Sequence, residues 1–243
     1  MEILRIKDGI VQGTSIAGVP FLARIVVPHT KRLRPMIPLR RYSGVAMHDT
    51  ANRNANADAM MHARYVQNLE NGGAGHQASY HFVVDDKQII QLIPITEKAW
   101  HAGDGSDGRG NSEFLAIEMC EHANGDRRKT ERHAQVLASA LLATLGGELA
   151  KHQDFSGKWC PNVILSRKEW PEFKAVIMGM RDTALEKGDT MEKSFTDRAK
   201  EYTVENGIFA DRDWDRPLTK RQVAEALYSF QRRVVDQIQK GEK

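Results

Sequence analysis

The stretch HQDFSGKWC, residues 152–160, begins with a histidine and ends with a cysteine. Imidazole nitrogen and thiolate sulfur are both zinc ligands, and a catalytic zinc site uses three protein ligands plus water. The loop between His152 and Cys160 is long enough to bring both ends to one ion, and Gly157 eases the turn. A surface loop without metal is the alternative, because no rule specifies this interval.

A third ligand would come from another part of the chain, and His48 is the candidate. It lies at the polar end of VAMHDT, residues 45–50, which we interpret as a short buried strand. Strand ends hold a side chain rigidly beside solvent, which suits a ligand. A half-buried histidine that binds no metal is the alternative. Of the other histidines, we expect His62 and His133 to be exposed on helices, and His29, His76 and His122 in loops are left unassigned.

The chain has two cysteines, Cys120 and Cys160, which are too few for a disulfide framework at this length. One bridge between them is compatible with the sequence, and so is a reduced state in which one thiol serves chemistry. A bridge would remove Cys160 from any metal site, so the two interpretations exclude each other. Cys120 follows Glu118 by two residues on one predicted strand, where a buried, inert thiol is expected.

Strands and helices alternate around these residues. The expected elements are strands at 45–50 and 114–120, a hairpin over 79–93, and helices over 56–70, 130–147 and about 166–180. Thr130 is expected to cap the second helix, and Ser166 with Glu169 resembles a capping box for the third, although Pro171 would delay its start. This order predicts an α/β (mixed α+β) fold with a central mixed β-sheet flanked by helices.

Five segments stand in an order that resembles a known family: VAMHDT, ASYHFVVDDKQIIQLIP, AWHAGDG, NSEFLAIEMCEH and HQDFSGKWCP. Together they are similar to zinc-dependent N-acetylmuramoyl-L-alanine amidases of type 2. This group includes phage endolysins and bacterial autolysins and is related to peptidoglycan recognition proteins. The resemblance covers about residues 20–180 and implies one Zn²⁺ per chain, bound by His48, His152 and Cys160.

The resemblance also implies roles in cutting peptidoglycan between N-acetylmuramic acid and the first L-alanine of the stem peptide. Glu118 matches the general base and Lys158 the cation that stabilises the tetrahedral intermediate. Tyr80 matches a position that is tyrosine in some branches and tryptophan in others. His101 and Trp100, in AWHAG, match a groove that contacts substrate. The chemistry agrees, because Glu118 is the one carboxylate in an apolar strand, where desolvation would raise its pKa.

Composition limits the partners. Hydrophobic residues make up 41% and charged residues 28% of the chain, as in ordinary soluble domains, and no apolar run is long enough to enter a membrane. Six basic residues and no acid lie between Arg24 and Arg41. This basic segment is compatible with a solvated loop and with a surface that contacts anionic wall polymers. No signature of nucleic-acid binding accompanies it.

We therefore expect a catalytic domain over 1–182, a linker over 183–194 and a small helical module over 195–243 that binds the wall, mediates oligomerisation or caps the fold. The N-terminus shows no signal peptide, which predicts synthesis in the host bacterial cytoplasm and action on the wall after release, as for a phage or prophage endolysin. The rivals are a cytoplasmic wall-recycling amidase and a non-catalytic peptidoglycan-binding protein on the same fold.

Overall fold

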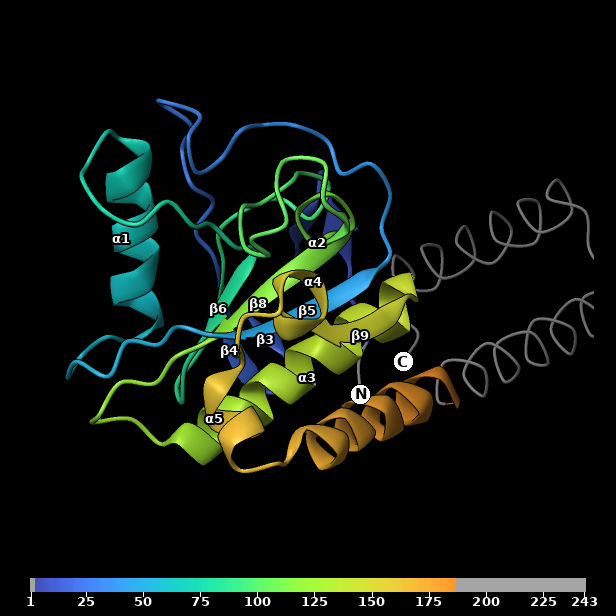
Figure 1. Ribbon diagram of the computed structural model, residues 1–243. Coiled ribbons are helices and arrows are strands. Elements are labelled where there is room, and N and C mark those ends of the chain that lie inside the picture. Colours follow the sequence, from blue (N-terminus) through green and yellow to red (C-terminus); the bar gives the residue numbers. More distant parts are fainter. Residues whose placement is uncertain (1–2, 187–243) are drawn as a thin grey trace, which may run out of the picture. The chain divides into compact units, whose positions relative to one another are not determined.

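The computed structural model describes residues 3–186, and Figure 1 shows a central sheet with helices on both of its faces. Seven strands form this sheet in the order β3-β4-β7-β6-β8-β5-β9. Their bounds are Ser15–Ile16 (β3), Val19–Ala23 (β4), Gly44–Asp49 (β5), Phe82–Val84 (β6), Ile89–Gln91 (β7), Phe114–Met119 (β8) and Glu148–Lys151 (β9). A separate two-stranded sheet consists of β1 (Ile6–Lys7) and β2 (Ile10–Val11).

The sheet is mixed, as predicted. β5 pairs in parallel with β8 on one side and β9 on the other, while β6 and β7 form the expected antiparallel hairpin. The helices are α1 (Ala59–Glu70), α2 (Arg109–Glu113), α3 (Arg127–Leu145), α4 (Gln153–Ser156) and α5 (Asn162–Ser166), with a further helix over 170–186. Within the described part, none of them has the length and apolarity that crossing a bilayer requires.

Two predicted helix caps are wrong. The helix expected to start at Thr130 begins one turn earlier, because the side chain of Asp126 accepts a hydrogen bond from the Lys129 amide at 2.9 Å. Ser166 does not open a helix but ends α5, and the chain then turns through Lys168, whose φ is +58°. The next helix starts at 170, so Pro171 lies in its first turn, where the missing N–H costs no hydrogen bond.

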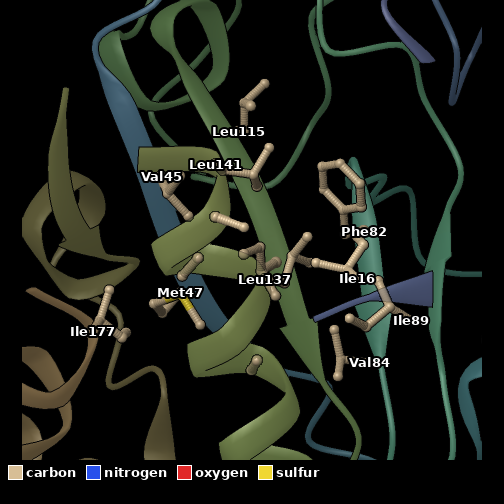
Figure 2. Close-up of a cluster of buried hydrophobic side chains, with 14 of the residues drawn as sticks. Ile16, Val45, Met47, Phe82, Val84, Ile89, Leu115, Leu137, Leu141 and Ile177 are labelled. Atoms are coloured by element: carbon tan, nitrogen blue, oxygen red, sulfur yellow. The ribbon is translucent and has the colours of Figure 1, made fainter. Parts of the chain in front are cut away.

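The alternation of side chains along β5 and β8 divides the core into two layers. One layer packs against α3 and is drawn in Figure 2; its members include Val45, Met47, Leu115, Ile117, Leu137 and Leu141. On the opposite face, Ala116 and Cys120 pack with Ala63 and Val66 of α1. Burying each large aliphatic side chain contributes about 1.5–3 kcal/mol, so the apolar positions fix which face the intervening residues occupy.

The basic segment is largely organised from within the molecule. Arg34 pairs with Glu97 at 2.7 Å, and both Arg40 and Arg41 pair with Glu113, at 2.5 and 2.9 Å. The carboxylate of Glu70 accepts hydrogen bonds from four backbone amides of the segment: His29, Lys31, Leu33 and Arg34. Because Glu97 and Glu113 lie tens of residues away in sequence, the basic residues appear unpaired when the sequence is considered alone. Three of the segment's six cations have internal partners, which leaves less charge for a polymer.

The last described residues form the helix over 170–186, which includes the first residues of the predicted linker. The remainder of that linker and the predicted helical module lie outside the described residues.

Candidate active site

His48, His152 and Cys160 come together at the ends of three elements. His48 lies near the end of β5, His152 directly follows β9, and Cys160 precedes α5. One potential ligand atom from each lies within 4.8 Å of the other two, and all three residues are buried. The Nδ1 atoms of the two histidines are 3.0 Å apart. The structure thus brings together the three residues that the sequence predicts as metal ligands.

This donor set fits zinc, for which two imidazole nitrogens and one sulfur are ordinary ligands. Burial lowers the pKa of His48 well below its usual value and that of His152 to about 4, with Lys158 adding to the second effect. Both imidazoles are therefore neutral, with a lone pair available on each. Burial also raises the pKa of the Cys160 thiol to about 12, so the thiolate needs a nearby cation to form.

Both cysteines are free thiols, so the disulfide alternative is wrong. Cys120 is buried against α1, and its neighbours are the apolar residues of that layer. The backbone amide of Asp49 donates to the Cys160 sulfur at 3.3 Å. Such a donor favours the charged form of the sulfur, as a metal site requires.

Glu118 lies beside His48 because β5 and β8 pair in parallel with these two residues in register. Each directly follows a residue that faces α3, Met47 in β5 and Ile117 in β8. Because side chains alternate along a strand, His48 and Glu118 both lie on the opposite face of the sheet. Burial and the charge of Asp49 raise the pKa of Glu118 to about 8, and Lys158 opposes this shift. One carboxylate oxygen is buried and has no hydrogen-bond partner. An unpartnered oxygen of this kind is available to take a proton.

A cavity of about 610 Å³ opens over this group, with walls from α1, the loop before β6 and the loop before α5. The predicted catalytic and substrate-binding residues that line it are Tyr80, Trp100, His101, Glu118 and Lys158, together with the candidate ligands His152 and Cys160. Tyr80 is nearly buried, and burial with the nearby Glu118 charge raises its pKa well above the usual value. Its hydroxyl is therefore a neutral group at the cavity wall.

His101 lines the cavity, as the predicted groove position implies, and it also contacts one of the candidate metal ligands. It is 6% exposed, and its ring lies against His48, with nitrogens 3.1 Å apart. Trp100 is half-buried, and its backbone exchanges hydrogen bonds with Ser79, so the chain is fixed on the N-terminal side of His101. Both residues thus remain candidates for substrate contact, and His101 in addition contacts His48, a candidate metal ligand.

The sequence interpretation missed Asp49 and Arg127. One carboxylate oxygen of Asp49 accepts from the Arg127 guanidinium at 2.5 Å, and the other accepts from the Val163 amide at 2.8 Å. This buried carboxylate ties α3 and α5 to the strand end that carries His48. An acid directly after a predicted ligand was the available signal for Asp49, while nothing marked Arg127.

His62 was expected to be exposed, and this is wrong. It is 7% exposed and lines the cavity from α1, where burial lowers its pKa to about 4. His133 is partly buried and bonds to the Asp85 carbonyl at 2.9 Å. Helical spacing alone did not reveal which face of α1 a neighbouring loop would cover.

Comparisons with known proteins agree with this geometry. A family model described as N-acetylmuramoyl-L-alanine amidase matches residues 38–163. Two curated relatives are amidases of Bacillus subtilis: XlyA, 41% identical over 60% of this chain and 48% of its own, and CwlH, 40% identical over 53% and 50%. The chain thus spans about half the length of these relatives.

Solved structures give the same result. The catalytic domain of XlyA is 37% identical with a TM-score of 0.58, covering 65% of this chain and 99% of that one. PlyL is 28% identical with a TM-score of 0.57, covering 65% and 97%. The family model covers more than half of the chain and includes His48, Glu118 and the stretch from His152 to Cys160, so this protein belongs to the N-acetylmuramoyl-L-alanine amidase family.

Proposed function

We propose that this protein is a zinc-dependent peptidoglycan hydrolase that cleaves the amide bond between N-acetylmuramic acid and L-alanine. The observation that carries the proposal is the convergence of two imidazoles and a thiol beside the partnerless Glu118 carboxylate at one end of a cavity. Membership of the amidase family supports the same reaction. One Zn²⁺ per chain is part of the proposal, with His48, His152 and Cys160 as its ligands.

When bound, zinc would polarise the scissile carbonyl and lower the pKa of water from about 15.7 to near 7. Glu118 takes the proton of the attacking water and returns it to the leaving nitrogen, as a general base and then acid. Lys158, on the same cavity wall, opposes the negative charge that develops on the carbonyl oxygen. Tyr80 contributes a neutral hydroxyl that can donate to the substrate.

The cavity holds the substrate beside these groups. Its wall from α1 and from the segment before β6 includes Met61, Tyr65 and Gln77, a mixture of apolar and polar side chains that suits a short peptide. Trp100 adds an aromatic surface. We assign the peptide stem to this side of the cavity and the scissile amide to the end beside Glu118.

Action on the bacterial wall as an endolysin is also part of the proposal. A solved structure described as a mutant endolysin from Bacillus subtilis, which is 36% identical to this chain, supports it. A wall-recycling amidase would instead prefer soluble fragments. Comparing intact sacculi with soluble muropeptides as substrates separates the two.

The test is digestion of purified peptidoglycan by the full chain, with mass analysis of the fragments and metal analysis of the protein. We expect free stem peptides that start with L-alanine, and one zinc per chain. Cys160→Ser should lose both zinc and cleavage, whereas Cys120→Ser, which alters the other buried thiol, should keep both. Wall binding without any released peptide would instead identify a binding protein on this fold.

A second variant isolates the base. Glu118→Gln keeps the size of the side chain and removes its charge, so zinc content should be unchanged while turnover falls about 10²–10⁴-fold. Unchanged turnover would exclude Glu118 as the base and leave Tyr80 or Lys158 to be tested next.

A further inference from the structure

The loop of residues 99–103, with the sequence AWHAG, contacts both histidines of the proposed metal site, His48 and His152. The Nδ1 of His101 is 3.1 Å from the Nε2 of His48, and the two rings are nearly perpendicular, at 89°. The other ring nitrogen of His101 is 3.2 Å from the carbonyl oxygen of Phe114, at the start of β8. His101 therefore links the backbone of one central strand to a side chain of the next.

The direction of these hydrogen bonds follows from the carbonyl group. A carbonyl oxygen only accepts, so the Nε2 of His101 must carry the proton that it donates to Phe114. In a neutral imidazole the Nδ1 is then an acceptor, and the Nε2 of His48 must donate to it. The proton of His48 is thereby held on Nε2, and the lone pair of its Nδ1 points toward His152, where the nitrogens are 3.0 Å apart.

The same loop also contacts the second histidine. The backbone of Ala102 forms a hydrogen bond with the His152 imidazole, and the Nε2 of that ring lies close to the neighbouring Gly103. The carbonyl of Ala102 accepts in this bond, so the Nε2 of His152 carries the proton and its Nδ1 is an acceptor as well. Two acceptor nitrogens at 3.0 Å repel each other unless a cation lies between them, so the loop prepares both rings for a metal.

The loop is itself held in place. The side-chain oxygen of Asn111 accepts hydrogen bonds from the backbone amides of His101 and Ala102, at 2.8 and 2.9 Å. The carboxylate of Asp104 in turn accepts from the amide of Asn111 at 3.3 Å and from that of Gly110 at 2.6 Å. These bonds fix the loop to α2 and explain how a loop residue can orient a ligand.

We infer that His101 is a positioning residue that sets the tautomer and ring orientation of His48 for metal binding, in place of the substrate contact expected from the sequence. Groups that hydrogen-bond to the outer nitrogen of a ligating histidine typically change metal affinity 10–100-fold when they are removed. This inference rests on the metal site of the proposed function. It predicts a defect in zinc affinity that exists without any substrate.

The test is the zinc dissociation constant of the full chain, measured by competition with a chromophoric chelator, in two matched variants. In His101→Asn, the amide oxygen lies near the position of Nδ1 and can still accept from His48. In His101→Gln, the amide lies near the position of Nε2, so it can reach Phe114 but not His48. Both are polar amides of similar folding risk, and unfolding in the metal-free state measures that risk directly.

We expect His101→Gln to weaken zinc binding about 10–100-fold and His101→Asn to bind at least several-fold more tightly than His101→Gln, with equal metal-free stability. Equal affinities of both variants and the wild type, with only KM raised, would overturn the inference and restore a substrate role. Affinity that tracks metal-free stability would show a merely structural role and also overturn it. A wild-type chain that binds no zinc would refute the proposed metal site itself, which is a separate result.

Discussion

The carboxylate of Glu113 holds together the starts of β5 and β8, the strands that carry His48 and Glu118. Glu113 is 1% exposed and ends α2, directly before β8. It accepts hydrogen bonds from the Ser43 hydroxyl at 2.7 Å and from Arg40 and Arg41 at 2.5 and 2.9 Å. Its backbone carbonyl accepts from the Ser43 amide as well. Residues 40–43 lead into β5, so this carboxylate joins the two strands.

These partners lower the pKa of Glu113 from 4.5 to about 2 against the opposing effect of burial. At about 1.4 kcal/mol per pKa unit, the ionised form stabilises the fold by at most about 3.5 kcal/mol. The arginines are more than half exposed, so solvent screening reduces this to about half. Because the folded pKa is the lower one, the contribution is complete above about pH 4.5 and is lost as the pH falls toward 2.

Glu113→Gln should therefore lower the free energy of unfolding by about 1.5–2 kcal/mol at pH 7. Relative to wild type, that loss should shrink to less than half by pH 3, where the unfolded wild-type carboxyl is already protonated. Urea unfolding of the full chain at pH 7, 5 and 3 measures both values. Glu148→Gln is the control, since Glu148 is half exposed and pairs with the exposed Arg109. A difference in the free energy of unfolding between wild type and Glu113→Gln that stays constant with pH would refute the reasoning. A loss of stability no larger than that of Glu148→Gln would refute it as well.

Three further predictions concern the site and its support. Arg127→Met leaves the buried Asp49 carboxylate without its cation and should cost about 3–5 kcal/mol in urea unfolding; a loss below about 1 kcal/mol would contradict this account. Gly44→Ala places a methyl group 2.0 Å from the Glu148 backbone oxygen and should destabilise by about 1–3 kcal/mol, seen as a lower Tm. Zinc at about 100 times its Kd should stabilise the wild type by about 2.7 kcal/mol and leave Cys160→Ser unchanged; an equal response of both would exclude Cys160 as a ligand.

Much of the fold follows from local pattern. The apolar run around Glu118, the hairpin over 79–93 and the helix ending at Glu70 were all predictable, because burial of one face imposes a period that survives in the sequence. Helix caps were less predictable: Asp126 and Thr130 are both competent caps four residues apart, and only packing decides between them. Paired charges such as Arg34 and Glu97 were not predictable, since the two partners are 63 residues apart.

The amino-acid sequence specifies which groups the site can use: two imidazoles, a thiol, a carboxylate and a lysine, in segments that the amidase family model matches. Only the tertiary fold sets the positions of these groups relative to one another. Parallel pairing of β5 with β8 and β9 sets Glu118 beside His48 and brings His48 to His152 across 104 residues of chain. The tertiary structure also turns His101 toward His48, because a hydrogen bond between side chains depends on register and loop anchoring, which no local pattern encodes.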